Sequence, residues 1–164
     1  MTNSSASDPR RDLLRHSLAT IAYRGGKMLR DAPATFGDFR ACEGARTPRQ
    51  ILAHISDLME WALSMAQGKQ HWHVSEPMAW NEERERFHAV LERFDDYLAT
   101  GNPLHAVPEN LFQGPIADAL THIGQIAMLR RMAATPVKSE NYFIAEVTAG
   151  RVGANQPAPK FEFD

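Results

Sequence analysis

Residues 47–68 read TPRQILAHISDLMEWALSMAQG, and this stretch decides the fold. Thr47 is a favoured N-cap residue, Pro48 suits the first position of a helix, and Gln50 completes a capping box. Gly68 is expected to end the helix. The apolar residues between these signals recur at helical spacing: Ile51, Leu52, Ile55, Leu58, Met59 and Ala62. The stretch therefore predicts an amphipathic helix that buries one face in a core.

Three further segments of the chain show the same helical period. Asp8-Pro9 supplies an N-cap and a first-turn proline, Trp80 opens the third segment, and Gly114-Pro115 is expected to start the last. No segment shows convincing strand alternation. Four amphipathic helices without strands predict an all-α fold, most simply a four-helix bundle. The predicted helices span residues 9–31, 47–67, 80–100 and 115–133.

The rest of the chain is expected to fold around that bundle as one domain, residues 1–164. Residues 1–8 are polar and should be frayed. Residues 134–164 lose helical periodicity and predict an irregular, extended tail packed on the bundle, with a short helix near 143–147. The charged run 82–86 is interpreted as a solvated face without function. The connections after the first and third helices exceed tight turns and are expected to cross an end of the bundle.

The net charge, the lengths of the apolar runs and the cysteine content limit the classes of protein to which the chain can belong. The net charge of −2 gives no basic field for nucleic acid, and no apolar run approaches the roughly 20 residues that span a bilayer. The N-terminus lacks the apolar core of a signal peptide. The single cysteine, Cys42, cannot form an internal disulfide or a cysteine zinc cluster. These features predict a cytoplasmic protein without a nucleic-acid or membrane partner.

Candidate metal ligands occur on two of the predicted helices. Asp118 and His122 are four residues apart, so a helix places both on one face, about 5–6 Å apart at their Cβ atoms. His54, on the inner edge of its helix, can supply a third ligand. Three protein ligands with positions left open describe a catalytic type of site, and imidazole with carboxylate suits zinc, nickel, iron or manganese. The alternative is that both histidines are ordinary hydrogen-bonded core residues and Asp118 a satisfied helix carboxylate.

Other polar and aromatic residues are candidates for contacts around such a site. Gln125 is expected to hydrogen-bond a ligand in the inner shell of the site or to orient Asp118 or His54. Asp57 and Trp61 lie near His54 on its helix. Tyr142 is expected either to close the mouth of the site or simply to fold the tail against the core. His71 and His73 form a weaker candidate pair, because alternate residues in a loop are expected to point apart.

Two of these stretches resemble the DinB-like family. Residues 47–58 with Trp61 resemble the second helix of that family, and residues 111–125 resemble its last bundle helix, whose mark is a histidine close before Gly-Gln and a ligand four residues upstream. The resemblance implies a four-helix bundle that holds a metal on three histidines. His54 and His122 match two of these positions. Asp118 stands at the third, where the family has histidine.

What the resemblance implies about function is a set of expectations. Family members with assigned activity include metal-dependent transferases and isomerases that use low-molecular-weight thiols, in which a metal lowers the pKa of the thiol and holds the thiolate. A thiol-linked transferase or a hydrolase, acting as a homodimer, is the expected function. The alternatives are a non-enzymatic protein that binds a small molecule in the same cavity and a module whose bundle face serves dimerisation alone.

Overall fold

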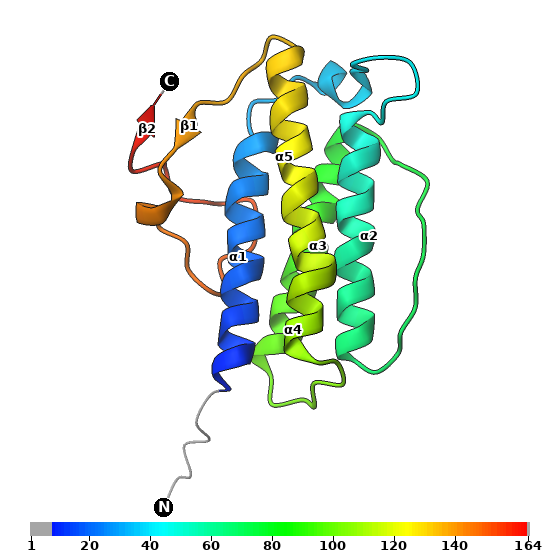
Figure 1. Ribbon diagram of the computed structural model, residues 1–164, viewed down its shortest axis with the longest axis vertical. Coiled ribbons are helices and arrows are strands. Elements are labelled where there is room, and N and C mark those ends of the chain that lie inside the picture. The colour runs from blue at the N-terminus through cyan, green and yellow to red at the C-terminus, as the bar shows by residue number, and fades with distance from the viewer. Residues whose placement is uncertain (1–7, 164) are drawn as a thin grey trace, which may run out of the picture.

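The computed structural model describes residues 8–163, and its long helices form a bundle (Figure 1). The expected fraying of residues 1–7 lies outside the described residues, whereas Asp8 caps the first helix. None of the helices in residues 8–163 is long and apolar enough to cross a membrane. The helices are α1 Pro9–Leu29, α2 Pro48–Ala66, α3 Trp80–Ala99, α4 Pro108–Leu111 and α5 Ala117–Met132. The predicted all-α four-helix bundle is confirmed.

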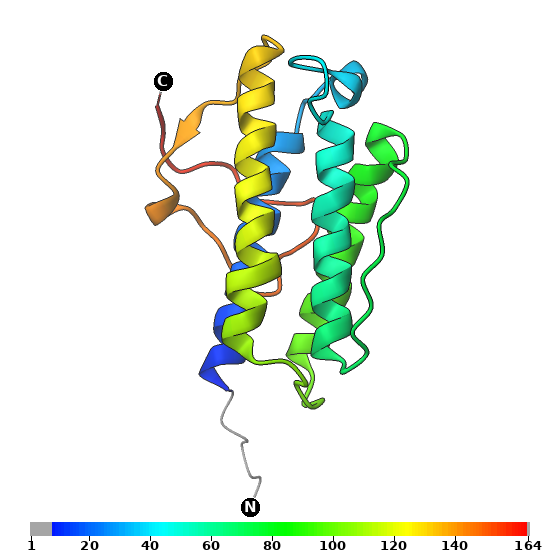
Figure 2. The same ribbon diagram turned by 45° about the vertical axis from the view of Figure 1, so that its right-hand side comes forward.

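The helices follow one another in an up, down, down, up order (Figures 1 and 2). Because α2 and α3 run in the same direction, residues 67–79 must return along the outside of the bundle. Thirteen extended residues span about 43 Å, which exceeds the roughly 28 Å of a 19-residue helix. The long connection therefore follows the second helix and runs along a side, which the sequence interpretation did not anticipate.

The predicted N-terminal capping residues determine where the helices begin. The side chain of Asp8 accepts a hydrogen bond from Arg10 N–H at 3.0 Å. At α2, Gln50 N–H donates to Thr47 Oγ1 at 3.4 Å, and Gln50 Oε1 accepts from Thr47 N–H at 2.9 Å. This capping box sets where α2 begins, so His54 falls at the edge of the buried stripe and is partly buried.

The last bundle helix begins earlier than predicted. The short helix α4 continues through a π-helical segment, η2 Phe112–Ile116, directly into α5. Pro115 therefore lies inside the helix, where it has no N–H to donate, and the wider π turn accommodates it. The proline was wrongly interpreted as a first-turn residue. Asp118 and His122 nevertheless lie in the regular α5, four residues apart.

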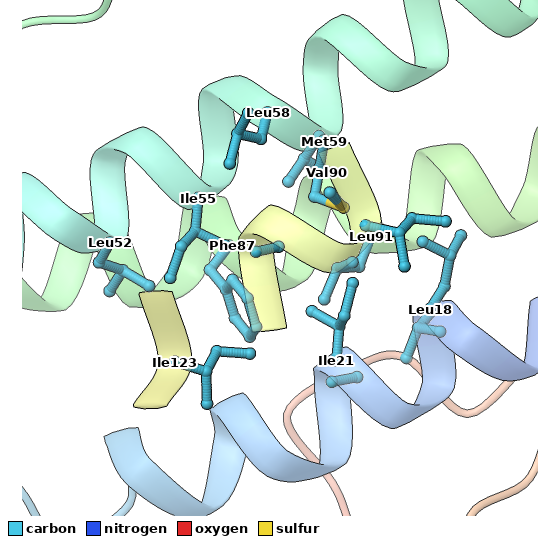
Figure 3. Packing of buried hydrophobic residues seen from close by; sticks show 14 of the residues in the cluster. Leu18, Ile21, Leu52, Ile55, Leu58, Met59, Phe87, Val90, Leu91 and Ile123 are labelled. Carbon is cyan, nitrogen blue, oxygen red and sulfur yellow. The ribbon is translucent and has the colours of Figure 1, made fainter. Parts of the chain in front are cut away.

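The core is built from all four long helices (Figure 3). Phe87 of α3 is fully buried and lies between Ile123 of α5 and the apolar side chains of α1 and α2. Its ring requires a glycine on α1, because a Cβ at Gly25 would stand 2.6 Å from Phe87 Cζ. Gly25 is thus a packing position, although glycine in a helix interior lowers the stability of the helix itself.

The tail packs on the bundle, as predicted, and is anchored through α1. A two-residue antiparallel ladder joins β1 Ser139–Glu140 to β2 Glu162–Phe163, with a 3-10 turn, η3 Tyr142–Ile144, close to the expected short helix. Buried Glu140 accepts hydrogen bonds from Tyr23 Oη and from Lys27 Nζ. A buried ion pair without one of its partners is costly, so these bonds fix the tail to one side of α1.

The interpretation of residues 82–86 as a solvated face is wrong for two of them. Glu83 is fully buried, and most of the Arg86 side chain is covered. Glu83 Oε1 accepts the Met78 N–H at 2.8 Å, while Arg86 donates to the buried carboxylate of Asp57. Burial raises the pKa of Glu83. Glu83 follows Trp80 and precedes Phe87 at helical spacing, so it belongs to the core stripe of α3.

Candidate metal centre

Three side chains from two helices converge at the α2–α5 interface. His54 comes from α2, and Asp118 and His122 come from α5. One potential ligand atom from each lies within 4.8 Å of the other two. Only 13% of the His122 side chain is exposed, against 47% of Asp118. The group is thus packed on the His122 side and open to solvent beside Asp118.

The hydrogen bonds of His122 leave one ring nitrogen free to bind a metal. Its Nδ1 lies 2.8 Å from Gln125 Oε1, and its Nε2 lies 3.4 Å from Asp118 Oδ1. With Gln125 Oε1 accepting a hydrogen bond from Nδ1–H, the lone pair of the neutral ring lies on Nε2. That lone pair faces a carboxylate, which is also an acceptor. The contact becomes favourable with a metal ion held by both residues, or with the opposite tautomer and a turned Gln125 amide.

His54 lies against His122 with no hydrogen bond to its ring from any residue of the described chain. The two ring centroids are 4.8 Å apart and the rings are nearly perpendicular, at 84°. Burial lowers the pKa of His54, and the neighbouring His122 and the Arg46 guanidinium lower it further. His54 is therefore held neutral with an available lone pair. The alternative interpretation expected hydrogen bonds to His54, and no residue from 8 to 163 makes one.

These donors fit a divalent metal ion. Two neutral imidazoles and one carboxylate are ligands that zinc and related first-row ions accept. Gln125 supplies the outer hydrogen bond that metal-bound histidines usually make. The structure brings together the three residues predicted as ligands. Gln125 hydrogen-bonds to His122, whereas it was expected to orient Asp118 or His54.

The connection at residues 67–79, here called the crossover, covers one side of the centre. Trp72 packs edge-on against His54, with ring centroids 6.0 Å apart, and against Trp61 at 5.5 Å. Asp57 holds the crossover by accepting from Ser75 N–H at 3.0 Å and from Ser75 Oγ at 2.7 Å. Asp57 makes no hydrogen bond to His54 within residues 8–163; it anchors the crossover, and its negative charge raises the pKa of His54 against the larger lowering effects.

The structure does not bring every predicted residue to the centre. Tyr142 lies against α1, where its ring is 6.3 Å from that of Tyr23 and the Arg24 guanidinium carbon is 4.3 Å from its centroid. It packs the tail rather than contacting the histidines. His71 and His73 do not point apart as expected, because their rings stack at 6.5 Å with an 8° tilt.

Two hollows in the surface flank the centre. One, of about 430 Å³, is lined by Arg46, His122 and Gln125 among apolar residues. The other, of about 400 Å³, is lined by Trp61 and Asp118. Sequence reasoning missed Arg46, although it directly precedes the capping box of the helix that carries His54. It also missed the contact of Trp72 with His54, because the path of the crossover was not foreseen.

The chain matches no family model, and no curated protein or solved structure is significantly similar to it.

Proposed function

We propose that the protein binds one divalent metal ion through His54, Asp118 and His122 and uses it in a reaction on a small molecule. One observation carries the proposal. A neutral imidazole without a hydrogen bond in the described chain, a second imidazole lone pair and a carboxylate converge within 4.8 Å. Each imidazole can offer one nitrogen lone pair and Asp118 offers its carboxylate oxygens, so the three side chains together can hold a cation. Zinc, nickel, iron and manganese all suit the donor set.

Each residue around the centre has a distinct part in this proposal. Gln125 fixes the His122 tautomer by accepting a hydrogen bond from Nδ1–H. Asp118 offsets part of the charge of the ion and, as an oxygen donor, favours a harder ion than a third histidine would. Trp72 and Trp61 restrict water on the side of His54. When bound, such an ion supplies Lewis acidity, which lowers the pKa of a coordinated water or thiol.

The finer part of the proposal is a thiol-linked transferase or hydrolase of the DinB-like type, acting as a homodimer. The supporting features are the two matching histidine positions, the regular spacing of Asp118 and His122 on α5, and the exposed side of Asp118. Exposure matters because a transferase needs room for a second ligand beside the protein donors. A dimeric mass by light scattering at micromolar concentration is the expected result for the assembly.

A cobalt-substituted protein tests the thiol reaction class. Co²⁺ bound at the centre should show visible absorption bands, and adding cysteine or glutathione should add a sulfur-to-cobalt charge-transfer band at millimolar thiol or below. The His122→Ala variant should show neither. Cobalt bands that no thiol perturbs would leave the metal centre standing and exclude the thiol-linked version. In that case, the hydrolase or the non-enzymatic binding protein is the remaining interpretation.

A further inference from the structure

Arg46 is a cation without a partner beside the metal centre. Its guanidinium is exposed and makes no hydrogen bond or ion pair with any residue from 8 to 163. Nearby arginines are engaged: Arg49 pairs with Asp38 at 3.0 Å, and Arg40 donates to the Ala45 carbonyl at 2.6 Å. Arg46 instead lines the same hollow as His122 and Gln125.

Arg46 lies on the side of the proposed metal centre where His122 is, because both residues line the same hollow. A guanidinium and a divalent ion repel each other, and the single negative charge of Asp118 does not neutralise both. A negatively charged group that enters the hollow would be attracted by both cations.

The other residues that line the hollow indicate the polarity and size of the molecule that fits it. Ile51, Met128 and Leu129 line it alongside the polar residues. Met128 is 55% exposed, so its side chain presents apolar surface to the hollow and to solvent. A volume of about 430 Å³ accommodates a small organic molecule with a short apolar skeleton.

We propose that this hollow binds a small organic oxyanion, a carboxylate or phosphate, whose charged group pairs with Arg46 while a second donor atom reaches the metal. The inference rests on the proposed metal centre and gives it a substrate class. The planar guanidinium matches two oxygens of a carboxylate or phosphate at once, which a lysine cannot do. A free solvated arginine with no ligand role is the competing interpretation.

The experiment titrates simple oxyanions into the cobalt-loaded protein and follows the visible bands. Acetate carries one carboxylate, malonate and succinate carry two at different spacings, and inorganic phosphate tests the other oxyanion. The variants are Arg46→Gln, Arg46→Lys and Arg131→Gln. The last removes the same charge from an exposed arginine at the end of α5 that does not line the hollow. Cobalt content is measured for each protein first.

The proposal expects one dicarboxylate or phosphate to bind wild type with a Kd at least about tenfold lower than that of Arg46→Gln, a difference of about 1.4 kcal/mol. Arg46→Lys should fall between them, acetate should change least, and Arg131→Gln should match wild type. Equal Kd values in wild type and Arg46→Gln, or an equal loss in Arg131→Gln, overturn the oxyanion site and leave the metal centre intact. Wild-type protein that takes up no cobalt overturns the proposed function and this inference with it.

Discussion

The Nε2 atom of His122 faces Oδ1 of Asp118 across 3.4 Å, with the opposite ring nitrogen bonded to Gln125. A neutral imidazole and a carboxylate repel each other in this orientation, since both present lone pairs. Two arrangements remove this repulsion: the opposite tautomer of His122, with the Gln125 amide turned over, or a metal ion held by both residues. The nearby ring of His54, kept neutral by burial that lowers its pKa, offers a further lone pair to a metal ion.

Replacing Asp118 separates these two possibilities. Asp118→Asn keeps the shape and removes the charge, so metal affinity should fall by more than about tenfold. Asp118→His should preserve or tighten binding of zinc or nickel, because imidazole is a good ligand for both. Competition with a metal-sensitive dye gives the dissociation constants. If all three proteins bind equally, Asp118 is not a ligand.

Gln125 should tune the centre without touching the ion. Gln125→Ala removes the acceptor that fixes the His122 tautomer, and metal affinity should fall about 10–100-fold. Thr121→Ala is the matched control. Thr121 is also exposed on α5, but its hydroxyl bonds only to the Ala117 carbonyl in the described chain. An unchanged affinity in Gln125→Ala would mean that the 2.8 Å contact does not orient a ligand.

The metal-free protein should lose stability in mild acid through His54. Its pKa in the folded chain is below the ordinary value of about 6.5, so the unfolded chain binds more protons between those two values. Stability is therefore full above about pH 6.5 and falls as the pH drops toward the lowered folded value. His88, whose pKa is also lowered by burial, adds to the slope in the same sense.

Urea unfolding of metal-free protein at pH 7.5 and 5.5 measures this effect. His54→Gln should show a smaller loss between the two pH values than wild type, with His88 accounting for what remains. Identical losses in the two proteins would show that His54 is not desolvated. Saturating metal should steepen the slope in wild type, since bound metal keeps the ligand histidines unprotonated in the folded chain while the unfolded chain still takes up protons.

A pair of glycines tests the packing of the bundle. Gly25→Ala drives a Cβ to 2.6 Å from Phe87, so it should destabilise the fold by about 1–3 kcal/mol. Gly124→Ala on α5 meets nothing within 4 Å and should stabilise the helix by about 0.5–1 kcal/mol. Thermal unfolding of both variants provides the comparison. Equal effects would contradict the close approach of α1 and α3.

The bundle could be predicted from the sequence because its signals are local. The capping box at Thr47 and Gln50 and the apolar stripe after it depend only on neighbours along one helix. The π-helical turn around Pro115 was missed because it depends on how the preceding residues pack. The burial of Glu83 was not predicted, because its charge was taken to indicate exposure to solvent although its helical spacing places it on the buried stripe of α3.

The three ligand residues could be predicted from the sequence for a similar reason, but the residues that surround them could not. Asp118 and His122 share a helix face by spacing, and His54 lies on the inner edge of its own predicted helix, a position that the resemblance to a known family also marks. Trp72 and Arg46 reach the centre through a crossover and a loop, whose paths depend on the order of the helices. Tyr142 was predicted near the site only because of its residue type. The ion pair of Glu140 with Lys27 instead holds the tail against α1, where Tyr142 packs.

Metal titration of protein purified without an affinity-column metal is the most direct test of the central claim. Wild type should bind one Zn²⁺ or Co²⁺ per chain. His54→Ala and His122→Ala should each lose at least about tenfold in affinity while keeping wild-type circular dichroism, and His16→Ala, an exposed histidine on α1, should bind as wild type does. Wild type that binds no metal stoichiometrically, or folded His54→Ala and His122→Ala proteins that bind it unchanged, would contradict the account.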